Sequence, residues 1–114
     1  MEPSQVAELA AKAIAEKKGQ EPLILDLRGV TLVADYFVIG SGTSPVQVEA
    51  IADRVEEILQ ERGIRPLRRE GRQHGRWVLL DYGAVVVHIF HEEERKYYEL
   101  ERLWRDARIT PREQ

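Results

Sequence analysis

The turn at residues 41–44 is the segment of this 114-residue chain whose residue types could best support chemistry. It joins a predicted strand to a predicted helix, where free backbone N–H groups can bind phosphate. Nucleotide chemistry at such a turn needs two carboxylates at alternate positions of a neighbouring strand to hold magnesium. Asp81 has Leu79 two residues before it, and the other candidate strands carry no such pair. This chemistry is therefore disfavoured, and a well-capped helix start is the simpler interpretation.

Two histidines offer metal binding as a second chemistry. His88 and His91 are three residues apart and are followed by three glutamates. Histidines at this spacing converge best on one helix, but His88 falls in a predicted strand and His91 at its end. No serine or threonine stands in a recognisable nucleophile setting. We therefore predict no metal site, no catalytic residue, no cofactor and no small-molecule substrate.

Residues 77–81 and 85–90 predict a hairpin with two unlike faces. If residues 82–83 form a two-residue turn, Trp77 pairs with His88. One face then carries only aliphatic side chains and belongs under helices. The other, here called the aromatic face, is predicted to be exposed and to bind a partner. Its members are Trp77, Leu79, Asp81, Ala84, Val86, His88 and Phe90.

Arginines are concentrated just before this hairpin. Beside an exposed face they could bind phosphate or carboxylates. They could equally be charges that protect a solvated strand edge from stray pairing, and the sequence leaves both interpretations open. No aromatic stacking motif accompanies them, so RNA is not predicted to be the main ligand. The six arginines are Arg62, Arg65, Arg68, Arg69, Arg72 and Arg76.

Hydrophobic periodicity and capping predict the elements that position these residues. The predicted helices cover about 4–18, 45–62 and 92–105, and the predicted strands 23–28, 36–40, 65–69, 77–81 and 85–90. Ser44 with Gln47 matches a capping box, and Pro45 suits the first helical position. The order α-β-β-α-β-β-β-α indicates an α/β (α+β) fold, a mixed sheet of about five strands packed with helices. Residues 1–105 are predicted to form one domain and 106–114 a flexible tail.

Composition excludes several classes of protein. The chain has no cysteine, which excludes disulfides, thiol catalysis and cysteine-ligated zinc. A formal net charge of −3 gives no overall attraction to nucleic acid or to anionic membranes. No apolar stretch approaches the roughly 20 residues needed to cross a bilayer, and the N-terminus lacks a signal-peptide pattern. We expect a cytoplasmic protein with no membrane partner.

Seven short runs of residues carry a family pattern in a single order. They are residues 34–39, 41–44, 50–53 with Gln47, 70–71, 77–83, 86–90 and 98–104. Through these runs, which cover about residues 6–104, the chain resembles the Iojap-related ribosomal silencing factors, the RsfS family. One run alone would be weak evidence, but seven in register are highly specific.

The resemblance implies a binding protein with a degenerate nucleotidyltransferase fold that lacks the metal-binding carboxylates. Members of the family bind the fourteenth protein of the large ribosomal subunit on the face that meets the small subunit. They thereby block subunit joining and repress translation. The resemblance also implies which residues bind the partner, because the contact surface of the family can be transferred to matching positions of this chain. The implied contacts are Trp77, Leu79, Asp81 and Tyr82, and two weaker candidates are Glu70 and His88. Candidate basic contacts are Arg68, Arg69, Arg72 and Arg76.

Two alternatives remain open, and further partners are allowed. A nucleotidyltransferase-like enzyme would bind nucleotide at residues 41–44. An RNA-binding adaptor would use the arginines, and its binding to naked RNA would depend steeply on salt. A silencing factor could also touch adjacent ribosomal RNA. An exposed aromatic face would in addition allow the free protein to form a homodimer.

Overall fold

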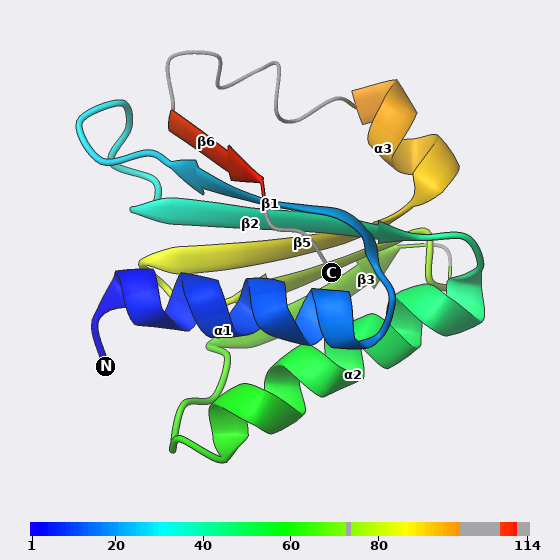
Figure 1. Cartoon of the computed structure of the whole chain (residues 1–114), viewed down its shortest axis with the longest axis horizontal. Helices are drawn as coiled ribbons and strands as arrows, with labels where there is room; N and C mark the ends of the chain where they lie inside the picture. The colour runs from blue at the N-terminus through cyan, green and yellow to red at the C-terminus, as the bar shows by residue number, and fades with distance from the viewer. Residues whose placement is uncertain (73, 99–107, 112–114) are drawn as a thin grey trace.

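The computed structural model describes residues 1–72, 74–98 and 108–111, which form three helices and one six-stranded sheet (Figure 1). In chain order the elements are α1 (Pro3–Glu16), β1 (Gln20–Asp26), β2 (Tyr36–Gly42), α2 (Pro45–Gln60), β3 (Arg68–Arg72), β4 (Trp77–Asp81), β5 (Val85–His91), α3 (Glu92–Tyr98) and β6 (Arg108–Pro111). The strands lie in the order β3-β4-β5-β2-β1-β6. Strands β2 and β5 are parallel and the other neighbours are antiparallel, which confirms the predicted mixed sheet.

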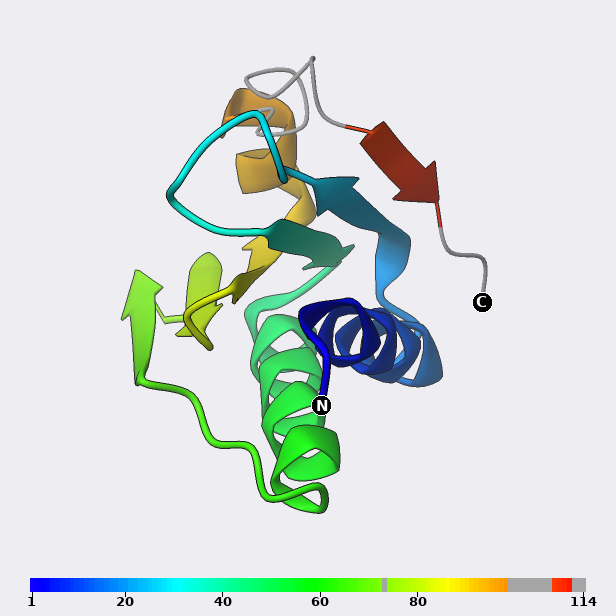
Figure 2. The ribbon, with the colours of Figure 1, turned by 90° about the vertical axis from the view of Figure 1, so that its left-hand side faces the viewer.

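Helices α1 and α2 lie together on one side of the sheet, and α3 lies on the other (Figures 1 and 2). The start of α2 confirms Ser44 as the N-cap, because its side chain accepts a hydrogen bond from the Gln47 N–H at 3.1 Å and Pro45 is the first helical residue. The other half of the predicted capping box differs, since the Gln47 side chain accepts from the Thr43 N–H. Residues 99–105 of the predicted last helix lie outside the described part of the chain. No helix in the described residues is long and apolar enough to cross a membrane.

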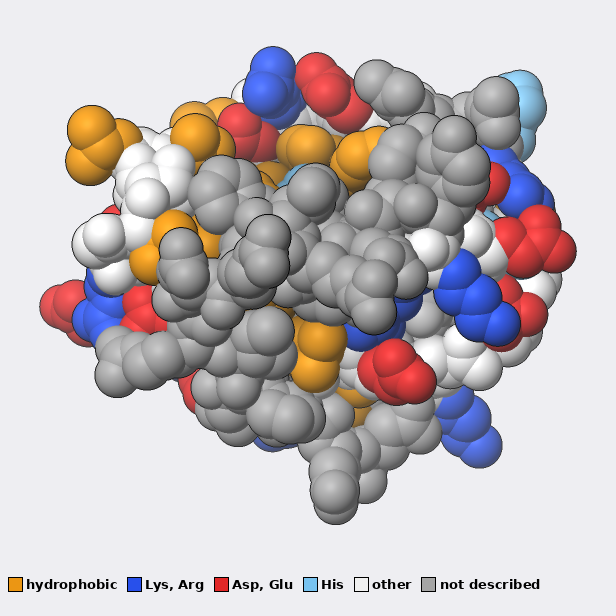
Figure 3. Space-filling model, turned by 90° about the horizontal axis from the view of Figure 1, so that it is seen from above, with side chains coloured by type: hydrophobic (Ala, Val, Ile, Leu, Met, Phe, Trp, Pro, Cys, Tyr) orange, Lys and Arg blue, Asp and Glu red, His pale blue; other side chains and the backbone are white. Residues whose placement is uncertain are grey.

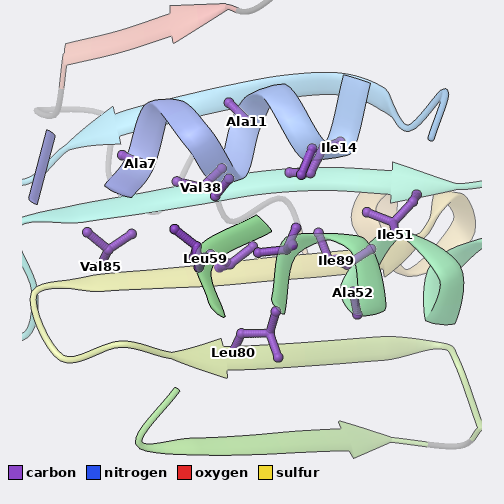
Figure 4. Packing of buried hydrophobic residues seen from close by; sticks show 14 of the residues in the cluster. Ala7, Ala11, Ile14, Val38, Ile51, Ala52, Leu59, Leu80, Val85 and Ile89 are labelled. Atoms are coloured by element: carbon purple, nitrogen blue, oxygen red, sulfur yellow. The ribbon is translucent and has the colours of Figure 1, made fainter. Parts of the chain in front are cut away.

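The main hydrophobic core fills the space between the sheet and α1 and α2 (Figure 4). Alternate residues of β4 and β5 point into it, as the period of two along a strand requires. The aliphatic face predicted for the hairpin is therefore confirmed as the face under the helices. Its members Val78, Leu80, Val85, Val87 and Ile89 are all buried.

A second apolar cluster lies on the opposite side of the sheet and contains most of the aromatic face. Phe90 is 0% exposed and His88 is 5% exposed. The prediction that this face is exposed is therefore wrong for its central part. Strands β1 and β2 add their own apolar side chains beside the hairpin, and so large an apolar area is costly to leave in water. The buried members are Leu25, Leu27, Ala34, Phe37, Ile39, Val86 and Phe90.

The register of the hairpin also differs from the prediction. Trp77 pairs with Phe90 instead of His88, and the Tyr82 N–H donates to the Val85 carbonyl at 2.9 Å. The turn therefore falls one residue later than predicted, because Gly83 adopts a φ of +85°, which favours glycine. The change moves every pair by two residues, so each side chain keeps the face that was predicted for it.

Strands β1 and β3 differ from their predicted positions, and β6 was not predicted as a strand; β1 begins three residues early, at Gln20. The strand predicted at residues 65–69 is β3 and begins at Arg68, because Pro66 has no N–H to donate to a ladder. Strand β6 falls within residues 106–114, for which a flexible tail was predicted. Its backbone pairs with β1 from Asp26–Arg108 to Leu23–Pro111, which gives hydrogen-bond partners to a strand that would otherwise be an edge. Four residues are too few for a clear period in the sequence.

Candidate partner-binding groove

A shallow groove of about 400 Å³ lies over β3 and β4. It is lined by Glu70, Gly71, Trp77 and Leu79, so three of the predicted contact residues share one depression. Cross-strand pairing explains why, since Glu70 pairs with Leu79 in the ladder between the two strands. Gly71 was missed as a lining residue because the strand was predicted to end at residue 69, whereas β3 continues to Arg72.

Trp77 forms the apolar wall of the groove and is half-buried. Its ring centroid lies 4.8 Å from that of Phe90, and its Nε1–H donates a hydrogen bond to His88 Nδ1 at 3.3 Å. Figure 3 views this side of the molecule, where hydrophobic side chains show at the surface beside acidic and basic ones. The indole is thus supported from within the protein, and part of it remains accessible.

His88 lies beneath the groove, among aromatic rings. Its ring makes an edge contact with Phe37 at 4.7 Å and is stacked near-parallel on Phe90 at 6.1 Å. Burial lowers the pKa of His88 from 6.5 to about 4, so the imidazole is neutral at pH 7. Because Nδ1 accepts from the indole, the proton of the neutral ring is on Nε2. The structure therefore places this predicted contact residue inside the protein, behind Trp77.

The buried His88 predicts a loss of stability in acid. On unfolding, its pKa returns to about 6.5, so below that pH the unfolded chain binds a proton that the folded chain does not. The free energy of unfolding should therefore fall by up to ~3 kcal/mol between pH 6.5 and pH 4 through this group. Urea unfolding of the wild type and of His88→Phe at both pH values measures the difference. Parallel pH profiles of the two proteins would show that His88 does not titrate as stated.

A charged rim closes the far end of the groove. Arg68 lies between two carboxylates, with its Nε 3.2 Å from Asp81 Oδ2 and its Nη1 3.3 Å from Glu70 Oε1. Asp81 Oδ1 also accepts a hydrogen bond from the Gly83 N–H at 2.8 Å, which holds the hairpin turn. Arg68 and Glu70 are largely exposed, whereas the Asp81 side chain is only 21% exposed. Pairing at such a surface contributes little to stability and leaves the charges available to a partner.

Tyr82 does not share the surface of the groove. Its side chain packs against the core under the helices, and its hydroxyl is buried with no hydrogen-bond partner among the described residues. Burial raises the pKa of the Tyr82 hydroxyl above its ordinary value. The structure thus separates Tyr82 from Trp77 by placing the two on opposite faces of the sheet.

The predicted basic residues do not assemble into one patch. Arg69 turns to the helix side, where it contacts Glu49 at 2.6 Å, Asp53 at 2.9 Å and Glu56 at 3.2 Å. At the other end of β4, Arg76 contacts Glu93 and Glu94 at the start of α3, at 3.0 and 2.7 Å. The Arg72 side chain lies outside the described part of the chain. Arg69 and Arg76 therefore compensate acidic side chains of their own chain.

The turn at residues 41–44 is occupied by contacts within the chain. The Thr43 N–H donates to Gln47 Oε1 at 2.7 Å, while Gln47 Nε2 donates to the Lys18 carbonyl at 3.1 Å. Together with the Ser44 cap, these bonds use backbone donors that a phosphate would need. Within the described residues, no group of three His, Cys, Asp or Glu side chains could hold a metal ion.

The whole chain, residues 1–114, matches one family model, described as "Ribosomal silencing factor during starvation". The chain belongs to the RsfS family. The ribosomal silencing factor RsfS of Bacillus subtilis is 47% identical over 110 residues, which cover 96% of this chain and 93% of that protein. The family resemblance predicted from the sequence is thus confirmed.

Further comparisons extend this likeness to structure and to a eukaryotic relative. The crystal structure of a Chromobacterium violaceum protein superposes with a TM-score of 0.87 at 36% identity, covering 91% of this chain and 87% of that one. A mouse protein named "Mitochondrial assembly of ribosomal large subunit protein 1" is 37% identical over 73 residues, which cover 61% of this chain and 32% of that protein. The fold is therefore that of a solved relative.

Proposed function

We propose that this RsfS-family chain represses translation by binding the large ribosomal subunit through its fourteenth protein. Bound on the face that meets the small subunit, it sterically prevents the two subunits from joining. Such a mechanism needs a firm contact surface and no chemical step. The family membership and the large-subunit name of the mouse relative support a ribosomal partner. Acting on ribosomal subunits, the protein would work in the cytoplasm.

The observation that carries the proposal is the supported Trp77 indole in the groove of Glu70, Gly71, Trp77 and Leu79. Binding energy at protein interfaces concentrates in a few aromatic anchors that sit in a desolvated centre with a polar surround. Trp77 and Leu79 provide the apolar centre here, and the charged rim provides the surround. Shape and charge thus suit a protein partner with a basic contact surface.

The proposed contacts divide into a centre and a periphery. Trp77 and Leu79 are the anchor, and Glu70, Asp81 and Arg68 set the orientation of the partner. The remaining predicted contacts are Tyr82, His88, Arg69, Arg72 and Arg76. Among these, Tyr82 offers only part of its ring from the other face, His88 acts from within, and Arg69 and Arg76 are engaged with their own chain. Adjacent ribosomal RNA would meet the chain only at this periphery.

Burial of the central part of the aromatic face reduces the apolar surface that is available for self-association. The homodimer predicted for the free protein depended on a broad exposed apolar surface. Phe90 and His88 are buried within one chain, so of the hairpin's aromatic face it is mainly Trp77 and Leu79, at the groove, that keep accessible apolar surface. A dimer that used this face would occupy the groove and compete with the ribosome.

Binding to isolated components separates the proposal from its alternatives. The chain should bind the purified fourteenth large-subunit protein, and that complex should persist without RNA. Binding to naked RNA alone, with a steep dependence on salt, would favour the RNA adaptor. A rise in melting temperature with nucleotide and magnesium would favour the nucleotide-binding enzyme. Either of the last two results without binding to the ribosomal protein would overturn the proposal.

Replacing Asp81 with asparagine should weaken binding to large subunits about three- to tenfold, as expected for one interfacial charge. The asparagine oxygen can still accept from the Gly83 N–H, so the turn and the stability should be preserved. Asp53→Asn is the matched control, because Asp53 is an exposed carboxylate of α2 that also pairs with an arginine but faces away from the groove. Equal effects of the two substitutions in a sedimentation titration would remove Asp81 from the interface.

A further inference from the structure

We propose that His88 is a positioning residue, which holds the Trp77 indole in one orientation so that the free protein already presents its anchor in the bound geometry. The inference deepens the proposed function and relies on it for the identity of the partner. Its direct evidence is the hydrogen bond of 3.3 Å from Trp77 Nε1–H to His88 Nδ1. The two residues come from neighbouring strands, but they are not a cross-strand pair, so the bond runs diagonally across the ladder.

The position of the acceptor is itself fixed by the surrounding rings. His88 lies between Phe37 of β2 and Phe90 of β5, with ring centroids 4.7 and 6.1 Å away. Phe90 is fully buried and also contacts Trp77 at 4.8 Å. Rotation of the imidazole would have to displace these buried side chains, which close packing resists. The Nδ1 atom is therefore a rigid point from which the half-buried indole is held.

The cost of keeping a histidine here supports the same role. His88 Nε2 is buried, and no hydrogen-bond partner for it exists among the described residues. A buried donor without a partner lowers stability, and a phenylalanine ring would fill a similar volume without that cost. What the histidine provides in this environment is the acceptor toward Trp77. Stability alone does not explain a histidine at this position, whereas orientation of the indole does.

Orientation of the anchor has a predictable effect on affinity. Without the hydrogen bond, a half-exposed tryptophan can populate several combinations of its three staggered χ1 wells with its broad, roughly two-fold χ2 torsion. A partner that accepts one of them then binds only that fraction of molecules, and the apparent affinity falls by the same factor. With about three to six accessible orientations, release of Trp77 should weaken binding about fivefold.

Two substitutions test this in the full chain. His88→Phe keeps an aromatic ring but has no acceptor, and His88→Asn places an amide oxygen close to the position of Nδ1. The Trp77 indole N–H resonance, assigned by its loss in Trp77→Phe, reports the hydrogen bond in the free protein. Titration with purified large subunits reports binding. His88→Phe should shift the resonance and weaken binding about fivefold, while His88→Asn should restore most of both.

A double-mutant cycle separates positioning from loosened packing. In a Trp77→Ala background, His88→Phe should cause no further loss of binding. Val86→Ala, in the same cluster and on the same strand, should lower stability without moving the indole resonance. An unshifted resonance in His88→Phe, or an equal loss of binding with and without Trp77, would overturn the inference. If wild-type chain and large subunits do not bind, the proposed function fails, and the resonance alone then decides whether His88 holds Trp77.

Discussion

Trp77→Ala is expected to weaken binding to the large ribosomal subunit at least about tenfold and to leave the fold intact. The side chain is half-buried at the groove, and a central aromatic anchor typically contributes ~2 kcal/mol or more to an interface. Each ~1.4 kcal/mol corresponds to a tenfold change in affinity, so the loss should be clear in a co-sedimentation titration. Leu79, which remains in the groove, cannot replace the area that the indole provides.

The fold of this variant must be checked alongside its binding. Val46→Ala is the matched control, since Val46 is an apolar side chain that is 80% exposed on α2, and α2 lies on the other side of the sheet from Trp77. It should bind as the wild type does. Wild-type affinity of Trp77→Ala would place the interface elsewhere. Loss of the cooperative unfolding transition would instead show that Trp77 belongs to the core.

Phe90→Ala is expected to have the opposite effect and to remove much of the stability of the chain. Phe90 pairs with Trp77 across the hairpin, yet it is 0% exposed whereas Trp77 is half-buried. Truncation of a buried phenylalanine costs about 3–5 kcal/mol, a large part of the 5–15 kcal/mol that a small domain typically has. The urea midpoint of unfolding should therefore fall steeply.

A conservative substitution calibrates this result. Phe90→Leu keeps most of the apolar volume and should cost less than half as much as Phe90→Ala. If Phe90→Ala unfolds at the wild-type midpoint but loses affinity for large subunits, the aromatic face would be an exposed interface after all. Together the Trp77 and Phe90 substitutions test where on this face the core ends and the groove begins.

Alternation along the strands was sufficient to predict which hairpin residues share a face. The period of two depends only on each strand being extended, so it was unaffected by the turn falling at Gly83 and not one residue earlier. The starting point of α2 was also predictable, because Ser44 and Pro45 carry local capping signals. These features depend on neighbours in the sequence, which explains why one sequence was enough.

Exposure of the aromatic face was not predictable in the same way. Whether Phe90 and His88 face water depends on β1 and β2, whose apolar side chains join theirs only once the sheet order is known. Which acidic side chains pair with the arginines also depends on the tertiary arrangement. Arg69 meets Glu49 of α2, and Arg76 meets Glu94 of α3, at separations of about twenty residues along the chain. The arginines are close together in the sequence, but in the fold Arg69 and Arg76 pair with carboxylates of different helices, and the arginines do not form one basic patch.

The sequence therefore predicted the residues at the centre of the candidate groove, but it did not predict how the residues around them are placed. Trp77, Leu79 and Glu70 converge on one groove, as their common face implies. Tyr82 follows directly after β4 but turns to the core side, where α2 supplies packing that the hairpin alone does not reveal. The family pattern named these positions together, and the structure gives them different physical roles.

The most direct test of this mechanism is a subunit-joining assay with purified small and large subunits. Large subunits would first be incubated with the wild-type chain or with Trp77→Ala, each at the same concentration, and the yield of joined ribosomes would be measured by light scattering. The wild type should suppress joining in proportion to its occupancy of the large subunit, and the variant should do so only at concentrations at least about tenfold higher. Normal joining with large subunits saturated by the wild-type chain would contradict the proposal that it acts as a steric block.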